Sequence, residues 1–310
     1  MTAPLTFSPA IAAAIDAGRP VVALESTIIT HGMPWPQNLD MARQVEAAVR
    51  DGGAEPATIA VMGGRIHIGL DDDDLQQLAQ TPSDQVMKLS RADLAVCIAN
   101  GRTGATTVAA TMICAALAGI RVFATGGIGG VHRGAEDTFD ISADLQELAR
   151  SPVTVVAAGA KAILDLPKTL EVLETLGVPV IAYGQDAFPA FWSRDSGLAA
   201  PLRMDSPEEI AAAADMRAAL GLPGGQLIAN PIPLEAEIPQ EEINPVIARA
   251  LADAADQAVA AKAVTPFLLG RIFELTDGRS LQSNIALVLN NARLGARIAG
   301  AMVAGRAENT

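Results

Sequence analysis

The chain has 310 residues, of which 50% are hydrophobic and 18% are charged. This apolar content suffices for a large core and argues against a disordered or fibrous protein. Lys and Arg together number 22 against 35 Asp and Glu, and aromatic residues make up only 3%. Because a net charge of -13 repels a phosphate backbone and few rings can stack on bases, we expect no nucleic-acid partner.

The cysteines and the apolar segments bear on location and on membrane contact. Cys97 and Cys114 lie in apolar stretches without metal-ligand spacing, so we expect buried, reduced thiols in a cytoplasmic protein. Residues 1–20 have no basic leader, and we expect no export signal. The longest uncharged stretch, residues 103–120, is rich in Thr, Ala and Gly, which favours a buried helix over a membrane span. We therefore expect no membrane association.

Short β-branched runs alternate with longer segments rich in Ala and Leu. This alternation predicts an α/β fold, a three-layer α/β/α sandwich with a mainly parallel central sheet, formed by residues 1–310 as a single domain. Residues 65–69 follow residues 62–64 closely enough to predict a hairpin, which would make the sheet mixed. The predicted strands are residues 21–24, 58–62, 94–98, 122–124, 153–157 and 178–182.

Helical patterns dominate after about Ser206, and the last one predicts a helix over residues 282–303. The acidic run at residues 71–74 is predicted to begin another helix, because carboxylates stabilise the positive end of the helix dipole. A metal site would need these side chains to converge, and adjacent helical residues do not face one another.

Parallel sheets bind ligands beyond the carboxyl ends of their strands, so residues after the predicted strands are candidates for function. Lys161 follows the predicted strand at residues 153–157, where desolvation would make its amine a nucleophile towards carbonyl groups. The alternative is a lysine that snorkels from a strand end. Lys88, between apolar residues, is a candidate anion ligand or a structural residue. Glu25 and the nearby His31 are candidate acid–base groups or inert, hydrogen-bonded residues.

Two loops are rich in glycine. Residues 100–108 lead from a predicted strand through a Gly/Thr loop into a small-residue helix, which suits phosphate binding by backbone N–H groups and equally suits helix capping. Residues 125–134 allow a ligand to approach the backbone but lack the spacing of a dinucleotide fingerprint. Asp137, Asp140 and Asp144 follow, and carboxylates at this spacing suit Mn²⁺ or Mg²⁺ or, alternatively, helix capping.

Three stretches, taken in order, resemble one family. They are Val22-Ala23-Leu24-Glu25-Ser26-Thr27-Ile28-Ile29-Thr30-His31-Gly32-Met33-Pro34, residues 125–145 with Gly159-Ala160-Lys161, and residues 278–287 through Asn290-Asn291-Ala292. Over residues 8–299 the chain is similar to the pseudouridine-5'-phosphate glycosidases, the family that also includes the indigoidine synthase A-like proteins. These long motifs are more specific than any single glycine loop.

The resemblance implies a three-layer fold, a homotrimer and a divalent metal, typically Mn²⁺. It also implies an enzyme of pseudouridine catabolism, which interconverts the nucleotide pseudouridine 5'-phosphate plus water with uracil plus ribose 5-phosphate. By motif, Glu25 matches the proton donor, Lys161 the Schiff-base lysine and Asp140 the metal site. The substrate-binding positions of the family correspond to Lys88, Val108, Ser142, Ala143 and Asp144 in this chain. The positions that line the same pocket correspond to Thr125, His132 and Asn284.

The implied chemistry explains why such a site needs a lysine. Pseudouridine joins its sugar to uracil C5 through a carbon–carbon bond, so the leaving-oxygen protonation of ordinary glycosidases is not available. An imine between Lys161 and C1' would supply an electron sink after Glu25 has helped to open the ribose ring. Lys88 and the N–H groups around Val108 would hold the phosphate. Asn284, which offers both a donor and an acceptor, would pair with the uracil edge.

The sequence leaves two other functions open. A phosphosugar aldolase or lyase would use Lys161 as its Schiff base without a nucleobase, and its turnover would be indifferent to Asn284→Ala. A non-catalytic phosphosugar sensor would bind its ligand through the glycine loops, with Lys161 only structural. The combination of Glu25, Lys161 and Asp140 argues against the sensor.

Overall fold

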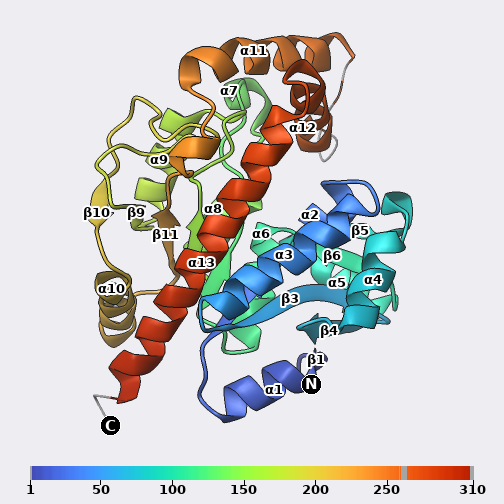
Figure 1. The fold of residues 1–310 in the computed structure, drawn as a ribbon, viewed down its shortest axis with the longest axis vertical. Helices are drawn as coiled ribbons and strands as arrows, with labels where there is room; N and C mark the ends of the chain where they lie inside the picture. Colours follow the sequence, from blue (N-terminus) through green and yellow to red (C-terminus); the bar gives the residue numbers. More distant parts are fainter. Residues whose placement is uncertain (1, 258, 260–263, 308–310) are drawn as a thin grey trace.

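The computed structural model describes residues 2–257, 259 and 264–307, which form helical layers on both faces of a central sheet (Figure 1). The long helix α13 (Arg279–Ala307) runs diagonally across one face and packs against α3 (Gln37–Asp51) and α10 (Pro207–Ala219). On the other face, α6 (Val108–Leu117) packs against α8 (Ala143–Leu148). The predicted α/β/α sandwich is therefore confirmed.

The described residues contribute eleven strands to this sheet. In chain order the strands are β1 (Leu5–Phe7), β2 (Val21–Leu24), β3 (Glu55–Met62), β4 (Arg65–Ile68), β5 (Met87–Leu89), β6 (Gly104–Thr106), β7 (Val122–Ala124), β8 (Thr154–Ala157), β9 (Val180–Tyr183), β10 (Leu202–Met204) and β11 (Gln226–Ala229). Their order in space is β1-β4-β3-β2-β7-β8-β11-β9-β10, and β6 pairs with both β3 and β5 off this path. Only the pairs β3–β4 and β3–β6 are antiparallel among them, so the predicted hairpin and mixed sheet are confirmed.

The remaining helices connect the strands or cover the sheet edges. They are α1 (Pro9–Asp16), α2 (Thr27–His31), α4 (Asp72–Gln80), α5 (Arg91–Ala99), α7 (Ala135–Thr138), α9 (Leu166–Thr175), α11 (Gln240–Asp256) and α12 (Val264–Leu275). Asp71 caps α4 by accepting a hydrogen bond from Asp74 N at 2.8 Å, so the acidic run begins a helix as predicted. The predicted final helix is also confirmed, although α13 extends beyond residues 282–303 at both ends.

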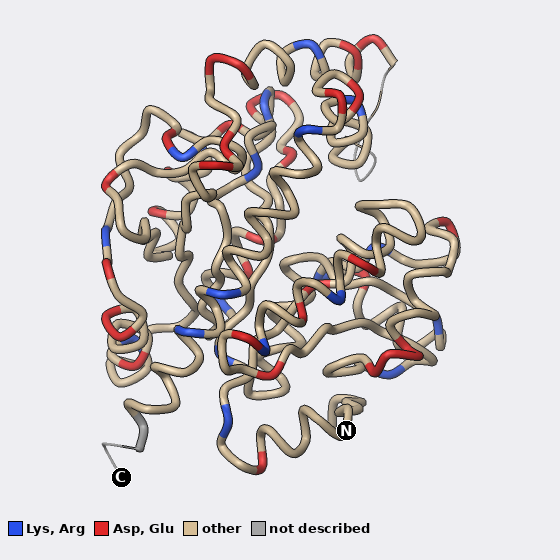
Figure 2. Tube along the Cα trace, viewed as in Figure 1, with Lys and Arg blue, Asp and Glu red and all other residues tan. Residues whose placement is uncertain are grey.

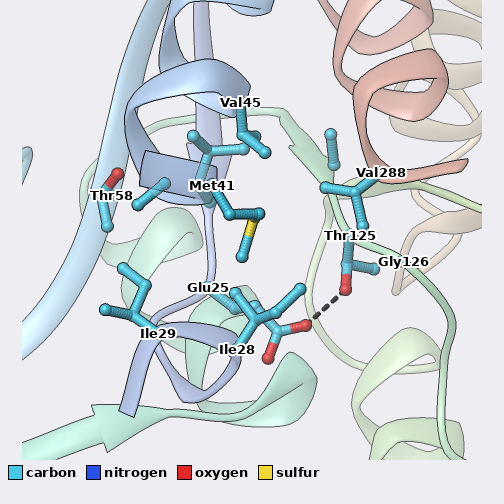
Figure 3. A pocket seen from close by; sticks show the side chains of 12 residues that line it. Glu25, Ile28, Ile29, Met41, Val45, Thr58, Thr125, Gly126 and Val288 are labelled. Atoms are coloured by element: carbon cyan, nitrogen blue, oxygen red, sulfur yellow. Dashed lines mark hydrogen bonds between the residues drawn. The ribbon is translucent and has the colours of Figure 1, made fainter. Parts of the chain in front are cut away.

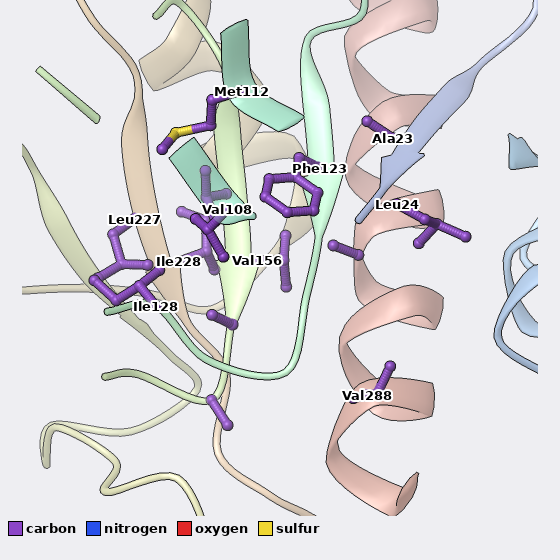
Figure 4. Packing of buried hydrophobic residues seen from close by; sticks show 14 of the residues in the cluster. Ala23, Leu24, Val108, Met112, Phe123, Ile128, Val156, Leu227, Ile228 and Val288 are labelled. Atoms are coloured by element: carbon purple, nitrogen blue, oxygen red, sulfur yellow. The ribbon is translucent and has the colours of Figure 1, made fainter. Parts of the chain in front are cut away.

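The central strands β2, β7 and β8 run through the middle of the hydrophobic core (Figure 4). Successive strand residues point to opposite faces, and Phe123 of β7 is fully buried on the side of Met112 in α6. Its neighbours Val122 and Ala124 face Gly295 of α13, where a Cβ atom would lie 3.3 Å from Ala124 Cβ. Because Gly295 has no side chain, α13 can lie directly on the sheet.

The predicted strand at residues 94–98 is wrong, because this segment lies inside α5. Ser90 and Asp93 form a capping box at the start of the helix, in which Ser90 N donates to Asp93 Oδ2 at 3.0 Å. Leu94 and Cys97 are buried whereas Val96 is 53% exposed, which is the burial period of a helix. The strand that precedes the Gly/Thr loop is therefore absent, and the loop itself contains the short strand β6.

The long uncharged stretch at residues 103–120 forms β6 and α6, both largely buried. Among the residues that the structure describes, no helix is long and apolar enough to cross a membrane. Cys97 and Cys114 are both buried free thiols, as expected. Burial raises the pKa of the Cys114 thiol to about 12, so this group stays protonated and unreactive at neutral pH.

Glu46 of α3 is a buried carboxyl group between the helix and the sheet. It accepts a hydrogen bond from Thr58 Oγ1 at 2.6 Å and pairs with Arg50 at 3.3 Å. Burial raises the pKa of Glu46 above its ordinary value of 4.5, although Thr58 and Arg50 act in the opposite direction. The folded protein thus binds this proton more tightly than the unfolded chain does. The stability that Glu46 contributes at acid pH is therefore lost as the pH rises through its folded pKa.

We expect Glu46→Gln to stabilise the protein at neutral pH, because burial disfavours the charged carboxylate and raises the pKa of Glu46, whereas the amide of glutamine carries no charge. At and below pH 4.5, where the wild-type carboxyl is protonated, the variant should have no advantage. Thermal unfolding of both proteins across this pH range measures the difference. A gap between the two melting temperatures that stays constant with pH would contradict the assignment.

Candidate active site

Three candidate residues follow neighbouring strands at one edge of the sheet. Glu25 comes directly after β2, Thr125 comes directly after β7, and Lys161 lies in the loop that follows β8. β7 lies between the other two strands and is parallel to both. Because neighbouring strands are about 4.8 Å apart, the ends of β2 and β8 are roughly 10 Å apart. The side chains of Glu25 and Lys161 can therefore reach a sugar-sized ligand from two sides.

The Glu25 carboxylate is held by two hydroxyl groups. Thr27 Oγ1 donates to Glu25 Oε2. Thr125 Oγ1 donates to Glu25 Oε1, as the dashed line in Figure 3 marks. Beside the carboxylate lies an apolar pocket, whose walls include Met41 of α3 and Val288 of α13. A carboxyl group that is fixed by two donors and bordered by apolar walls is suited to proton exchange with a ligand away from bulk water.

Thr125 is held in place by a residue of α13 whose role the sequence alone did not reveal. Asn291 of α13 is fully buried, and its Nδ2 donates to the Thr125 carbonyl oxygen at 2.8 Å. Its Oδ1 accepts from Asn230 Nδ2 at 2.9 Å. The signal in the sequence was an asparagine inside an apolar helix, because a buried amide requires hydrogen-bond partners.

The loop that carries Lys161 is tied to the glycine-rich loop after β7. Lys161 N donates to the Ile128 carbonyl oxygen at 3.1 Å, and Ile128 N donates to the Gly159 carbonyl oxygen at 3.1 Å. The Lys161 side chain is half-buried, and its amine has no hydrogen-bond or ion-pair partner among the described residues. An amine without a partner is available to attack a carbonyl carbon.

Asp144 lies in the first turn of α8 and directs its carboxylate towards backbone amides. Ala109 N donates to Asp144 Oδ1 at 2.9 Å, and Gly129 N donates to Asp144 Oδ2 at 2.7 Å. Ser142 caps α8 by accepting from Asp144 N at 3.2 Å, so the capping alternative for this segment is confirmed. Asp140 precedes α8 and Asp144 lies in its first turn, so the two residues lie near the start of this helix and do not share a helical face. Ala143, which lies between the candidate substrate-binding residues Ser142 and Asp144, is the first residue of α8.

The start of α6 offers fewer available N–H groups than its sequence suggested. Thr107 caps the helix, with its side chain accepting from Ala110 N at 3.5 Å, as the capping alternative predicted. Ala109 N is already bonded to Asp144. Of the first residues of α6, Val108 retains an N–H group without a partner in the part of the chain that the structure describes. An anion at this helix end would thus meet Val108 N–H.

Lys88 lies in β5, close enough to His31 for their charges to interact. Burial lowers the pKa of His31, and the positive charge of Lys88 lowers it further. His31 Nδ1 lies 2.6 Å from Thr30 Oγ1. These contacts favour a neutral, hydrogen-bonded His31, so the positive charge at this position belongs to Lys88.

Asp140 faces His132 across a short antiparallel pairing. His132 N donates to the Asp140 carbonyl oxygen at 3.0 Å, and His132 Nδ1 lies 3.9 Å from Asp140 Oδ2. Within the described ranges, no three His, Cys, Asp or Glu residues are grouped as metal ligands, so Asp137, Asp140 and Asp144 form no common site. The Asp140 side chain is 45% exposed. One exposed carboxylate fits a hydrated Mn²⁺ or Mg²⁺ ion, because these ions keep several waters and need few protein ligands.

Asn284 of α13 accepts a hydrogen bond from the indole group of Trp192. The two atoms, Trp192 Nε1 and Asn284 Oδ1, are 2.7 Å apart. An indole N–H can only donate, so it fixes the orientation of the amide and leaves Asn284 Nδ2 as the group that a ligand would meet. Val288 lines the Glu25 pocket one helical turn further along, so Asn284 lies on the same side of α13.

Charged residues are spread over the molecule. Figure 2 shows acidic residues along much of the trace, with fewer and scattered basic residues. In this acidic protein, Lys88 and Lys161 provide local positive charge for an anionic ligand.

Comparisons with known proteins show the family of the chain. The sequence matches the family described as indigoidine synthase A like protein over residues 10–301. Pseudouridine-5'-phosphate glycosidases of Paracoccus denitrificans and Jannaschia sp. are 76% and 74% identical to this chain, and the alignments cover 96% and 97% of it and 98% and 99% of theirs.

Two solved structures share the fold. The crystal structure of the prealnumycin C-glycosynthase AlnA in complex with ribulose 5-phosphate matches with a TM-score of 0.90 and 39% identity over 98% of each chain. An indigoidine synthase A-like protein from Thermotoga maritima matches with a TM-score of 0.86 and 33% identity over 96% of each chain. The resemblance drawn from the sequence motifs is confirmed, and the chain belongs to the indigoidine synthase A like protein family.

Proposed function

We propose that the protein is an enzyme that reversibly cleaves the C–C glycosidic bond of pseudouridine 5'-phosphate to give uracil and ribose 5-phosphate. The observation that carries the proposal is the identity of 76%, across nearly the whole chain, with a pseudouridine-5'-phosphate glycosidase. The C-glycosynthase of the same fold, in complex with ribulose 5-phosphate, further supports a sugar phosphate as ligand. The presence of Glu25 and Lys161 at one edge of the sheet supports the proposal, because a carboxyl group and an amine suit this chemistry.

In the proposed mechanism, the Lys161 amine bonds to C1' of the ribose, and the ring oxygen leaves with a proton from Glu25. The nitrogen, which is positively charged after this step, loses a proton to the Glu25 carboxylate and regains its lone pair, and a proton is then added to uracil C5. The electron pair of the C1'–C5 bond moves to the base, while the lone pair of the Lys161 nitrogen forms the C=N bond of an imine. Water adds to C1' of the imine, and the C–N bond breaks to release ribose 5-phosphate and restore the amine.

The phosphate and the metal occupy separate positions in this proposal. Lys88 and the Val108 N–H group would bind the phosphate, which holds the sugar in place while its far end reacts. Asp140, together with water molecules, would hold Mn²⁺ or another divalent cation. When bound, the ion supplies positive charge that orients anionic or hydroxyl groups of the substrate. Asn284 Nδ2 would donate a hydrogen bond to a carbonyl oxygen of uracil.

The assembly and the location are further parts of the proposal. A homotrimer in the cytoplasm is the state that the family resemblance implies. The two buried free thiols are in keeping with a reducing compartment.

The test is incubation of purified protein and Mn²⁺ with pseudouridine 5'-phosphate, with uridine 5'-phosphate in parallel, followed by quantification of uracil and ribose 5-phosphate. We expect equal amounts of both products from the C-linked nucleotide and none from the N-linked one. A chelator should reduce the rate. A folded, metal-loaded protein that releases no uracil would contradict the proposal. Turnover of ribose 5-phosphate alone would instead indicate the aldolase, and stabilisation by sugar phosphates without turnover would indicate the sensor.

A further inference from the structure

An ion pair with a buried carboxylate joins the start of α5 to α8. Arg91, the first residue of α5, donates from Nε to Glu147 Oε2 at 2.7 Å and from Nη2 to Glu147 Oε1 at 2.8 Å. Ser151 Oγ also donates to Glu147 Oε1, at 2.7 Å. The Glu147 side chain is 1% exposed, whereas that of Arg91 is 49% exposed. Two parallel hydrogen bonds to one carboxylate fix both the distance and the orientation of the two helices at this point.

Both partners of this ion pair lie close in sequence to candidate substrate-binding residues. Lys88 of β5 precedes Arg91 by three positions. Asp144 precedes Glu147 by three positions, so the two residues lie on the same side of α8, about one turn apart. The ion pair therefore connects the segment that carries Lys88 with the helix that begins at the candidate substrate-binding residues.

The two connected elements are short. β5 has three residues and, among the described strands, pairs with β6 alone. α8 has six residues. Elements of this length have few backbone hydrogen bonds of their own, so their positions depend on tertiary contacts. A bidentate ion pair between them is therefore suited to set their separation.

We propose that Arg91 and Glu147 are positioning residues, which hold Lys88 and the start of α8 at the separation in which both bind the sugar phosphate. The proposal rests on the proposed function, because it takes both segments as parts of the substrate site. The ion pair acts through the backbone of α5 and α8. Its loss lets the two segments move apart and weakens binding of the phosphate, while Glu25 and Lys161, which follow other strands, keep their places.

The first test is a double-mutant cycle on KM for pseudouridine 5'-phosphate. Glu147→Gln nearly keeps the shape of the side chain but removes its charge and one acceptor oxygen, and Arg91→Ala removes the donors. We expect each variant to raise KM about tenfold, with kcat changed by less than about threefold. Since both variants break the same contact, the double variant should raise KM no further. Arg91→Lys, which replaces the fork by a single ammonium group, should give an intermediate KM.

Two outcomes of this cycle would contradict the positioning role. A raised KM in Arg91→Ala with a wild-type KM in Glu147→Gln would show that Arg91 binds the phosphate itself. Independent, multiplying effects of the two substitutions would show that they do not act through their shared contact. If Arg91→Ala does not fold, because it leaves a buried carboxylate unpaired, Glu147→Gln and the double variant still decide the result.

Arg43→Ala is the matched control. Arg43 of α3 also makes a bidentate ion pair, with Asp72 of α4, at N–O distances of 2.8 to 3.0 Å. This pair joins helices that carry neither Lys88 nor the start of α8. Arg43→Ala should therefore keep wild-type KM and kcat. A KM raised as far as in Glu147→Gln would show that any loss of an ion pair perturbs the site, and the specific role would be wrong.

The second test measures borohydride trapping of Lys161 with ribose 5-phosphate and with ribose. In wild type the phosphate should accelerate trapping, because it anchors the sugar. In Glu147→Gln this acceleration should fall about tenfold, while ribose is trapped at nearly the wild-type rate. A general loosening of the fold would instead slow the trapping of both sugars, which would contradict the positioning role.

Failure of this inference can be told from failure of the proposed function. Wild-type KM and unchanged acceleration by phosphate in a folded Glu147→Gln protein would overturn the positioning role and leave the proposed function intact. A wild-type protein that neither cleaves pseudouridine 5'-phosphate nor traps ribose 5-phosphate would overturn the proposed function and this inference together.

Discussion

Replacing Lys161 by Ala is expected to abolish both turnover and the borohydride-trappable adduct, while the protein folds normally. Lys161 is half-buried in the loop after β8, and its amine has no hydrogen-bond or ion-pair partner among the described residues, so its removal breaks no such side-chain interaction there. Without the amine no electron sink forms at C1', and the C–C bond has no route to cleavage. We expect kcat to fall by roughly a thousandfold or more, as for other covalent nucleophiles.

Two further variants make this result specific. Lys161→Arg keeps a positive charge but has no nucleophilic amine, so it should be as inactive as Lys161→Ala. Lys168→Ala removes a lysine of α9 that forms ion pairs with Glu136 and Asp165. This variant should retain turnover within about twofold. Mass spectrometry of the reduced adduct would locate the modified residue. Wild-type turnover by Lys161→Ala, or trapping at another lysine, would show that the imine mechanism is wrong.

The strands that precede Glu25 and Thr125 could be predicted, because a buried strand is marked by a pattern in its own few residues. The buried β-branched runs at residues 21–24 and 122–124 correspond to β2 and β7, and their ends place Glu25 and Thr125. Five strands were missed, namely β1, β5, β6, β10 and β11. β6 has only three residues within a Gly/Thr loop, and β11 begins with the polar Gln226, although it lies between β8 and β9 in the sheet. Neither segment has a pattern that distinguishes it from a loop.

The contacts that shape the site could not be predicted, because they join residues that are distant in sequence. Asp144 meets Ala109 across 35 positions, and Trp192 meets Asn284 across 92. Spacing along one helix suggested that Asp144 was a metal ligand or a cap, whereas tertiary packing directs its carboxylate to two backbone amides. Residue types thus indicated the chemistry available, and only the fold determines which groups each side chain meets.

Replacing Glu25 by Gln is expected to reduce cleavage of pseudouridine 5'-phosphate by about 10²- to 10⁴-fold, the range for loss of a general acid. Glutamine has nearly the same shape and still accepts one hydrogen bond from Thr27 or Thr125, so the surrounding contacts are largely kept. It cannot give a proton to the ring oxygen as the ribose opens. The rate of uracil release measures this loss.

The trapping assay separates ring opening from the later steps. Ribose 5-phosphate in solution already contains some open-chain aldehyde, so Lys161 can form an imine with it without help from Glu25. We therefore expect Glu25→Gln to keep the trappable adduct while losing cleavage of the nucleotide. Glu55→Gln is the matched control, because Glu55 pairs with Arg50 at the opposite end of the sheet. Equal losses of trapping and cleavage in Glu25→Gln would place Glu25 at imine formation itself, and ring opening would then need another acid.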